Sequence, residues 1–304
     1  MSKPLISIII PVYNGCPHLQ SCFKILEKIT YENIEIIFIE NNSTDDSNKL
    51  LKRFCSGKKN TKLLFCKKQG PGAARNVGLK KSSGEYISFL DVDDEILPDK
   101  FDLQLQAFRK YPSASMVIGQ TLKRYENGRS YNPNDGNLKF GLNQSPNIGF
   151  FWLKQFQHNP HISGVLLKRN IVDRGISFPE QLFFGEDIAF FVKIGLIEDI
   201  VIIDDQVSIY NRHNLSSVSI SNSNIHITER YLKFFTEFSI PYFSKKNIER
   251  WNKIGLQISK RITFKLMMKI LFVIDHDKYK SLNDFNFQNY PKYYYGYYII
   301  FKIF

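Results

Sequence analysis

The chain has 304 residues, of which 43% are hydrophobic and 23% are charged, and its formal net charge is +12 at pH 7. This composition excludes disordered and fibrous proteins, and the length predicts one large domain or two smaller ones. The cysteines are few for the length and form no C-x-x-C pair, which argues against a disulfide scaffold and a zinc site. We expect reduced thiols in a cytosolic protein at all four positions, Cys16, Cys22, Cys55 and Cys66.

Neither a secretion signal nor a membrane span is expected. The N-terminus has one early lysine and an apolar run of only six residues before Pro11, which is shorter than the core of a signal peptide. A membrane span needs about 18 or more apolar residues, and Lys265 and Lys269 interrupt the nearest candidate, residues 262–274. The sequence therefore predicts a cytoplasmic protein.

The positive charge is concentrated towards the C-terminus. Residues 225–304 hold 14 Lys and Arg against 6 Asp and Glu, a surplus of +8 that leaves +4 on residues 1–224. The stretch ends in PKYYYGYYIIFKIF, and this mixture of aromatic and basic residues is typical of contact with an anionic membrane surface. The alternative is a helical appendage whose aromatic side chains form its own core. Nucleic acid is not an expected partner.

The first elements in chain order predict an α/β fold. Four apolar stretches are expected to be strands, at residues 5–12, 34–39, 62–66 and 86–90. Because they are apolar throughout rather than alternating, the sheet should be buried on both faces. Helical patterns lie between them at residues 17–29, 45–54 and 72–80, with Ser43 placed to cap the second. This order predicts a mostly parallel, doubly wound sheet that binds ligands beyond the carboxyl ends of its strands.

The pattern is less regular after residue 98. We expect a helix that ends near Tyr111, a strand at residues 116–118, a long polar loop at 126–146 and an apolar segment at 163–167. The stretch FFGEDIAFFVKIG at 183–195 predicts a loop that leads into an amphipathic helix. The expected organisation is a catalytic domain over residues 1–224 and a basic, aromatic, helical region over residues 225–304.

An acidic cluster directly follows the fourth strand. In an extended chain, Asp91 and Asp93 would point to the same side, where they could share a divalent cation. Carboxylate oxygens favour Mg²⁺ or Mn²⁺ bridging a diphosphate. A calcium EF-hand loop does not fit, because Ile96 stands where that loop needs glycine. The alternative is a solvated acidic turn without a metal.

A glycine-rich stretch opens the third helix. The sequence GPGAARN at 70–76 would allow a ligand to approach backbone N–H groups and the positive helix end. It matches neither the Walker loop nor the dinucleotide G-x-G-x-x-G pattern, so an ordinary strand-to-helix turn is the alternative. Arg75 could pair with a phosphate or hold a neighbouring carboxylate.

Two further positions carry candidate chemistry. Glu186 and Asp187 could supply a general base for a bound hydroxyl, although acids in a first helical turn also stabilise the helix dipole. His213 could ligate a metal or contact a phosphate, or it could be structural.

Five segments, taken in this order over about residues 4–220, resemble family 2 glycosyltransferases of the GT-A fold: ISIIIPVYN, IENNSTDD, GPGAARNVG, GEYISFLDVDD and GEDIAFF. The resemblance implies that Asp93 is the main ligand of Mg²⁺ or Mn²⁺, with Asp91 towards the ribose and the metal and Asp94 supporting both. It also implies that Asp187 deprotonates the acceptor and that His213 lies near the diphosphate. The nucleotide pocket would include Pro11, Tyr13, Asn14 and Arg75.

One segment departs from the family pattern. Relatives usually read D-D-G-S where this chain has Glu40, Asn41, Asn42 and Ser43. The second acid of that motif commonly accepts a hydrogen bond from the uracil N3–H, which the carbonyl oxygen of Asn41 can also do. We therefore expect Glu40 and Asn41 in the nucleotide site and a UDP-sugar as the donor.

The resemblance implies a single in-line displacement with inversion. A hexosyl or N-acetylhexosaminyl group would pass from a nucleotide-diphospho-sugar to a hydroxyl of a surface glycan or a lipid-linked saccharide precursor. Two alternatives remain. A sugar nucleotidyltransferase uses a related sheet but usually carries its glycine-rich loop after the first strand, and a nucleotide-sugar or glycan-binding protein could retain the fold without turnover.

Overall fold

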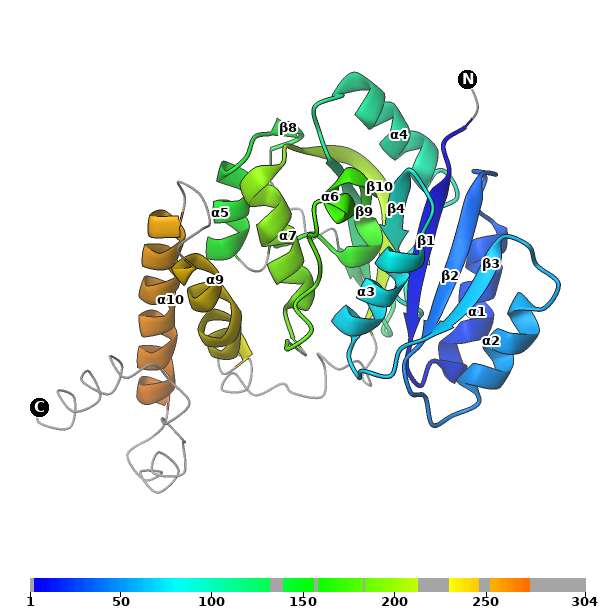
Figure 1. Ribbon diagram of the computed structural model, residues 1–304, viewed down its shortest axis with the longest axis horizontal. Coiled ribbons are helices and arrows are strands. Elements are labelled where there is room, and N and C mark those ends of the chain that lie inside the picture. Colours follow the sequence, from blue (N-terminus) through cyan, green and yellow to red (C-terminus); the bar gives the residue numbers. More distant parts are fainter. Residues whose placement is uncertain are drawn as a thin grey trace, which may run out of the picture. The chain divides into compact units, whose positions relative to one another are not determined.

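The computed structural model describes residues 3–131, 139–155, 158–182, 184–212, 230–245 and 252–273 (Figure 1). The chain forms two compact units, Met1–Ser216 and Ser217–Phe304. The predicted boundary between residues 224 and 225 falls among residues outside the described ones.

A mixed sheet forms the centre of the first unit. Its strands follow the order β3-β2-β1-β4-β9-β6-β10-β5, with β7 paired to β6 and β8 paired to β10. The strand bounds are β1(Ile6–Val12), β2(Ile34–Glu40), β3(Thr61–Phe65), β4(Tyr86–Phe89), β5(Glu95–Ile96), β6(Met116–Tyr125), β7(Ser130–Tyr131), β8(Gly141–Asn143), β9(Val165–Lys168) and β10(Ile200–Arg212).

The first four strands confirm the predicted parallel sheet. β1 pairs with β2 and β4, and β2 pairs with β3, all in parallel. β9 then enters antiparallel between β4 and β6, while β6 and β10 are parallel. Because β9 runs against its neighbours, its amino end lies at the same sheet edge as the carboxyl ends of β4 and β6. Segments that precede β9 therefore share an edge with the loop after β4.

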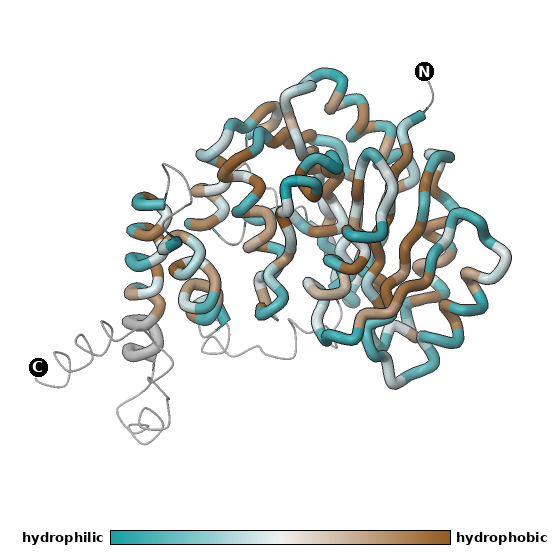
Figure 2. Tube along the Cα trace, in the orientation of Figure 1, coloured by the Kyte–Doolittle hydropathy of each residue, from teal (hydrophilic) through white to brown (hydrophobic). Residues whose placement is uncertain are grey.

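Helices lie on both faces of the parallel half (Figure 1). Figure 2 shows that much of its strands is hydrophobic. Ile8 and Ile10 of β1 belong to one core cluster with Leu19 and Phe101. On the other face, a Cβ added at Gly78 would lie only 2.4 Å from Cγ2 of Ile9, so the helix that contains Gly78 packs directly on β1. The helices of this half are α1(Cys16–Glu27), α2(Ser47–Cys55), α3(Pro71–Lys81) and α4(Lys100–Lys110).

Two predictions in this unit need correction. Ser43 does not cap the second helix, because α2 begins later, with Asp46 at the N-cap position and no side-chain cap. Instead, the Ser43 hydroxyl accepts a hydrogen bond from the backbone N–H of Asn14. The predicted loop at 126–146 is not structureless, since it contains β7 and β8, which pair with the long strands.

The remaining helices of the first unit lie beside the second half of the sheet. They are α5(Asn147–Lys154), the 3₁₀ segment η2(Ile162–Gly164), α6(Asn170–Asp173) and α7(Glu186–Ile197). α5 and α7 pack closely, because a Cβ added at Gly149 would lie 2.5 Å from the backbone nitrogen of Leu196.

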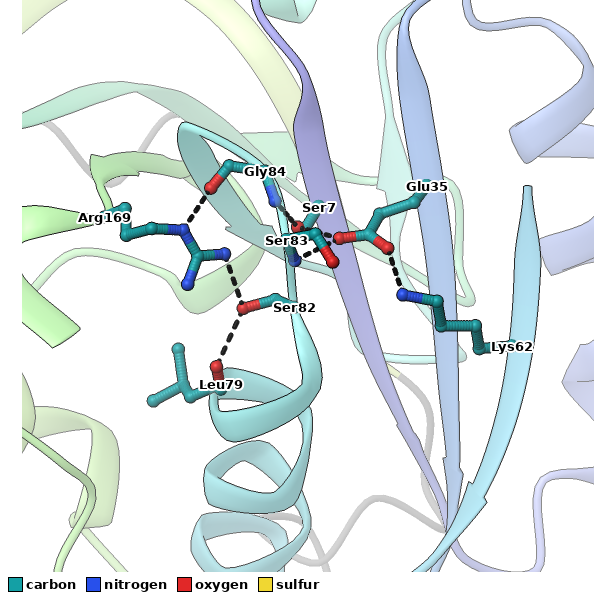
Figure 3. Close-up of polar contacts among 8 residues, drawn as sticks. All are labelled: Ser7, Glu35, Lys62, Leu79, Ser82, Ser83, Gly84 and Arg169. Carbon is teal, nitrogen blue, oxygen red and sulfur yellow. Dashed lines mark hydrogen bonds and ion pairs between the residues drawn. The ribbon is translucent and has the colours of Figure 1, made fainter. Parts of the chain in front are cut away.

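A polar network connects the amino ends of the parallel strands (Figure 3). The Glu35 carboxylate, 6% exposed, accepts hydrogen bonds from Ser7 Oγ (2.6 Å), Lys62 Nζ (2.7 Å) and the backbone N–H of Ser83. Burial alone would raise the pKa of Glu35, but these hydrogen bonds outweigh it and hold the pKa below its ordinary value. One carboxylate thus fastens β1, β2, β3 and the turn before β4.

Arg169 extends the network on its other side. Its Nε donates to the carbonyl oxygen of Gly84 at 2.6 Å, and its Nη2 donates to Ser82 Oγ at 3.1 Å. The Ser82 hydroxyl in turn donates to the Leu79 carbonyl at the end of α3. We call these groups, together with Glu35, Ser7, Lys62 and Ser83, the amino-edge network.

In the second unit, the described residues form helices. They are a π-helical segment η3(Phe234–Ser239), α9(Ile240–Ser244) and α10(Asn252–Val273). The Ser239 and Ser259 hydroxyls lie 2.6 Å apart and are buried. Among the described residues, no helix is both long and apolar enough to cross a membrane. The aromatic stretch at 291–304 lies outside them.

Candidate active site

The loops after β1 and β2 hold each other at the carboxyl edge of the sheet. Asn14 has a left-handed backbone (φ 48°), which asparagine tolerates better than most residues. Its backbone N–H donates to Ser43 Oγ at 3.1 Å, and its Oδ1 accepts from the backbone N–H of Thr44 at 2.8 Å. Tyr13, 54% exposed, is next to this junction. Pro11 lies near the end of β1, where it pairs with Ile39 of β2. Three predicted nucleotide residues are therefore brought to one place.

Glu40 shapes the loop after β2. Its buried carboxylate accepts from the backbone N–H groups of Asn42 (3.3 Å) and Ser43 (2.5 Å), and Asn42 has a left-handed backbone (φ 64°). The loop therefore turns tightly around its own acid. Glu40, the last residue of β2, thus holds the loop that follows it.

Asn41 connects the loop after β2 to the loop before α3. Its Nδ2 donates to the carbonyl oxygens of Cys66 (3.0 Å) and Lys68 (2.7 Å), and its Oδ1 accepts from the backbone N–H of Gly70 (2.9 Å). The side chain is 2% exposed. Both amide hydrogens are thus used in positioning the glycine-rich loop.

The acidic cluster forms a turn. The backbone N–H of Asp94 donates to the carbonyl oxygen of Asp91 at 2.9 Å, so the expectation of an extended chain from Asp91 to Asp93 was wrong. Val92 packs towards α1, since a Cβ added at Gly15 would meet its Cγ1 at 3.2 Å. Asp91 and Asp93 remain partly exposed, whereas Asp94 is 1% exposed.

Arg75 joins the two acidic motifs. Its Nη2 lies 2.7 Å from Oδ1 of Asp91, and its Nη1 lies 2.8 Å from Oε1 of Glu186, a residue 111 positions further along the chain. The side chain is only 4% exposed, and its guanidinium lies 5.5 Å from the centre of the Phe178 ring. The Arg75 side chain thus fixes the start of α7 against the loop after β4.

Glu186 and Asp187 begin α7 after Gly185, whose left-handed backbone (φ 76°) directs the chain into the helix. Burial and the neighbouring Asp187 raise the pKa of Glu186 to about 7 despite Arg75. Burial also raises the pKa of Asp187, and Arg75 limits that rise. Asp187 is partly exposed and accepts a hydrogen bond from the backbone N–H of Ile188, whereas Glu186 is buried. Asp187 is therefore the more exposed residue of the pair.

Asp94 is held by residues that the sequence did not indicate. Ser163 Oγ donates to Asp94 Oδ2 at 2.6 Å and accepts from the backbone N–H of Asp91 at 3.3 Å. The fully buried Lys100 donates to the carbonyl oxygens of Ser163 and Val165, and burial lowers its pKa to about 7. These contacts fix the turn after β4 on the segment before β9.

Two more residues next to the turn have no sequence signature. His161 Nδ1 lies 3.5 Å from Asp94 Oδ2, and its ring packs on Tyr210 with centroids 4.5 Å apart. Asn211 Nδ2 donates to the carbonyl oxygen of Asp93 at 3.0 Å. His161 has no nearby motif, and Asn211 lies two residues before the predicted His213 in the sequence. His213 itself lies outside the described residues.

A metal bound here would need ligands beyond the side chains of the described residues. Within the described residues, no group of three or more His, Cys, Asp or Glu side chains could hold a metal ion by itself. The turn does offer carboxylate oxygens, and the buried Asp94 Oδ1 has no hydrogen-bond partner among the described residues. Mg²⁺ and Mn²⁺ typically take one or two carboxylates and complete their coordination with phosphate oxygens and water. Asp91 and Asp93 fit such an ion.

The sequence profile named Glycosyl transferase family 2 matches residues 7–175, more than half of the chain. The chain belongs to this family. The family 2 chain is 30% identical over 248 residues to an uncharacterized glycosyltransferase of Rickettsia bellii, an alignment that covers 77% of this chain and 34% of the relative. It spans less than half the length of that protein and of the next three relatives, for which the covered share is 42%, 39% and 47%.

Two solved structures share the fold of this family 2 chain at low sequence identity. S. aureus TarS 1–349 in complex with UDP-GlcNAc has a TM-score of 0.58 and 18% identity, covering 86% of this chain and 81% of that one. The mannosyltransferase PcManGT from Pyrobaculum calidifontis, in complex with GDP-Man and Mn²⁺, has a TM-score of 0.57 and 14% identity, covering 92% and 83%. These likenesses establish a GT-A-like fold with C-terminal helices.

Proposed function

We propose that this family 2 chain transfers a hexosyl or N-acetylhexosaminyl group from a nucleotide-diphospho-sugar to an acceptor hydroxyl, with inversion. The observation that carries the proposal is the buried Arg75, which pairs with Asp91 and Glu186 at once. This contact brings the candidate base at the start of α7 to the acids that follow β4. Donor and acceptor could therefore meet at one edge of the sheet.

The loops after β1, β2 and β3 suit the nucleotide. Asn14, Ser43 and Asn41 hold these loops together, and Tyr13 offers an exposed aromatic face to a base. A uridine nucleotide is the expected donor, which agrees with the UDP-GlcNAc bound to TarS. Since Asn41 already uses both amide hydrogens, it would serve the nucleotide mainly by positioning the glycine-rich loop.

Asp187 is the proposed general base. A carboxylate with a raised pKa accepts a proton from a hydroxyl more readily than an ordinary one, and Asp187 is the more accessible acid of its pair. Glu186 and Arg75 hold the start of α7, so that Asp187 keeps its orientation. The acceptor oxygen would then attack the anomeric carbon as Asp187 takes its proton, and the nucleoside diphosphate would leave from the opposite face.

Asp93 and Asp91 would hold a Mg²⁺ or Mn²⁺ ion together with the diphosphate. PcManGT, of similar fold, binds Mn²⁺ with its donor. When bound, such an ion neutralises charge on the leaving diphosphate. Arg75, fixed to Asp91 Oδ1, orients that carboxylate for the task.

Calorimetric binding of UDP, GDP and CDP, with and without Mn²⁺, tests the donor site. We expect Mn²⁺-dependent binding of UDP that is lost in Asp93→Asn and retained in Asp205→Asn, a matched change at an exposed residue of β10. If none of the three nucleotides binds to the wild type, the proposed donor site is wrong.

A transfer assay separates the three candidate activities. Incubation with UDP-GlcNAc or UDP-glucose and lipid-linked saccharide acceptors should release UDP in the wild type. Asp187→Asn should lower this rate by roughly 10² to 10⁴-fold while donor binding persists, because only proton acceptance is removed. Release of pyrophosphate from a sugar phosphate and UTP would instead indicate a nucleotidyltransferase. Donor binding without any product would indicate a binding protein.

We further propose that the acceptor is a surface glycan or lipid-linked precursor reached at the inner face of the membrane. The support is the surplus of +8 on residues 225–304 and their aromatic end. Removing residues from 285 onward should release the protein from anionic vesicles in a sedimentation assay. Equal binding of both forms would refute the membrane location without affecting the proposed reaction.

A further inference from the structure

Beside the acidic turn, two buried polar atoms make no hydrogen bond with the described residues. They are Oδ1 of Asp94 and Nδ1 of His161. Nδ1 lies 3.5 Å from the other carboxylate oxygen, Oδ2, which already accepts from Ser163 Oγ. Buried polar atoms without partners are rare in folded proteins and often mark functional positions. A small movement would let Nδ1–H of His161 donate a hydrogen bond to the Asp94 carboxylate. Such bonds often shorten when a site binds its ligand.

The rest of the His161 ring is placed for contact with a ligand. Its side chain is 23% exposed although Nδ1 is buried, and the ring packs on Tyr210 with an angle of 31° between the planes. Nε2 makes no hydrogen bond with the described residues and, unlike Nδ1, is not fully buried. The Nδ1 side thus faces Asp94, and Nε2 is left accessible.

The chemistry of Nε2 limits what it can bind. If Nδ1–H donates to Asp94, Nε2 carries a lone pair and accepts hydrogen bonds. Burial lowers the pKa of His161 to about 4, so the ring is neutral near pH 7. A neutral acceptor suits a sugar hydroxyl, which can donate a proton, and does not suit a phosphate oxygen, which cannot.

The strand order indicates that this sugar belongs to the donor. The proposed nucleotide loops follow β3, β2 and β1, and the acids follow β4. His161 precedes β9, the next strand outward, and lies at the same sheet edge. A donor laid along this edge would place its base over β1 and β2, its diphosphate near β4 and its sugar towards β9.

We propose that His161, positioned by Asp94, accepts a hydrogen bond from a hydroxyl of the donor's transferred sugar. This inference rests on the proposed function. Asp94 is a positioning residue here, whereas His161 contacts the substrate. Ser163 keeps the Asp94 carboxylate oriented.

The test compares a nucleotide with its sugar conjugate. The parent protein carries Asp187→Asn, which prevents turnover. Dissociation constants for UDP, UDP-GlcNAc, GDP and GDP-mannose are measured in this parent and in the parent with His161→Leu, His161→Gln or Asp94→Asn added. His161→Leu should raise the dissociation constant of the nucleotide-sugar roughly ten-fold. The dissociation constant of the matching nucleotide should stay within about two-fold of its value in the parent. His161→Gln, which keeps an acceptor oxygen, should recover part of the loss, and Asp94→Asn should show a smaller loss of the same kind. Partial unfolding would raise the dissociation constants of nucleotide and nucleotide-sugar by the same factor, so it cannot imitate this pattern.

Tyr210→Phe is the matched control, since it keeps the ring under His161 and should leave both constants unchanged. Equal weakening of nucleotide and nucleotide-sugar in His161→Leu, or no weakening of either, would overturn the inference while leaving the proposed function standing. If the parent protein binds none of the four compounds, the proposed function fails and the inference fails with it.

Discussion

The two edges of the parallel sheet carry buried acids in opposite states. At the amino edge, Glu35 receives three hydrogen bonds, and its pKa lies below the ordinary value. At the carboxyl edge, Glu186 and Asp94 have raised pKa values, and Asp94 Oδ1 has no hydrogen-bond partner in the described part of the chain. The same sheet therefore carries at one edge a buried acid, Glu35, held by three hydrogen bonds, and at the other edge two buried acids whose pKa values are raised.

This difference separates stability from function. A satisfied buried carboxylate stabilises the fold because every lost interaction with water has been replaced. Unsatisfied or repelling acids cost stability and persist where a ligand, a metal or a proton completes them. Paired substitutions, one at each edge, can test whether the edges differ in this way.

The largest effect is expected for the two arginines. Arg75→Met leaves buried Glu186 without its ion pair, which should lower the free energy of unfolding by about 3–5 kcal/mol. Arg169→Met, at the amino edge, removes only hydrogen bonds to a carbonyl and a hydroxyl, which should cost about 1–3 kcal/mol. Urea unfolding measures both. Donor turnover should disappear in the first variant and remain at the wild-type level in the second; retained turnover in Arg75→Met would contradict the proposed role.

A smaller loss is expected at Glu35. Glu35→Gln replaces one acceptor oxygen by a donor that faces Ser7, Ser83 or Lys62, and should cost about 1–3 kcal/mol of unfolding free energy. Nucleotide binding measured by calorimetry should not change, because the network lies at the far ends of the strands. A shifted dissociation constant would mean that the two edges are coupled.

Asn41→Asp should give a still smaller loss of stability together with weaker nucleotide binding. The new carboxylate would face the carbonyl oxygens of Cys66 and Lys68, and losing both donated hydrogen bonds should cost about 1–2 kcal/mol. The matched change Asn33→Asp, at an exposed residue whose amide donates to Lys3, should affect neither property by much. Tighter UDP binding in Asn41→Asp would mean that an acid at this position contacts the base after all.

The most selective effect concerns pH. Because the folded pKa of Glu35 is lowered, its contribution to stability is present above its unfolded pKa and is lost as pH falls through the folded value. Glu186 has a raised pKa, so it lowers stability as pH rises from about 4.5 to about 7. Glu186→Gln should therefore gain stability over the wild type across that interval. Unfolding curves at several pH values check this, and a constant difference between the two proteins would contradict the raised pKa.

Much of the first half of the fold could be predicted from the sequence. The first four strands lie within one residue of their predicted bounds, because apolar runs such as Leu5–Val12 can be buried only as the inner strands of a covered sheet. The motif residues Asp91, Arg75 and Glu186 also come together as patterns of acids and glycines at strand ends suggest. Local sequence determines the strands because each depends on residues close in the chain, whereas the meeting of Arg75 with Glu186 joins residues 111 positions apart.

Other features depend on contacts between distant residues and could not be predicted. Ser43 has the right residue type for a helix cap, but its hydroxyl is used by Asn14, which only the folded loops bring near. The sequence before β9 has no motif, and His161 gains its interest only because an antiparallel strand places it beside Asp94.

The sequence by itself therefore determined the α/β class, the family and the identity of the acidic motifs, since these follow from hydrophobic periodicity and from residues adjacent in the chain. Only the tertiary structure decided which acids are satisfied and which are not. Whether a buried carboxyl has a low or a raised pKa depends on donors from other strands, such as Lys62 beside Glu35, and on burial that no local pattern specifies.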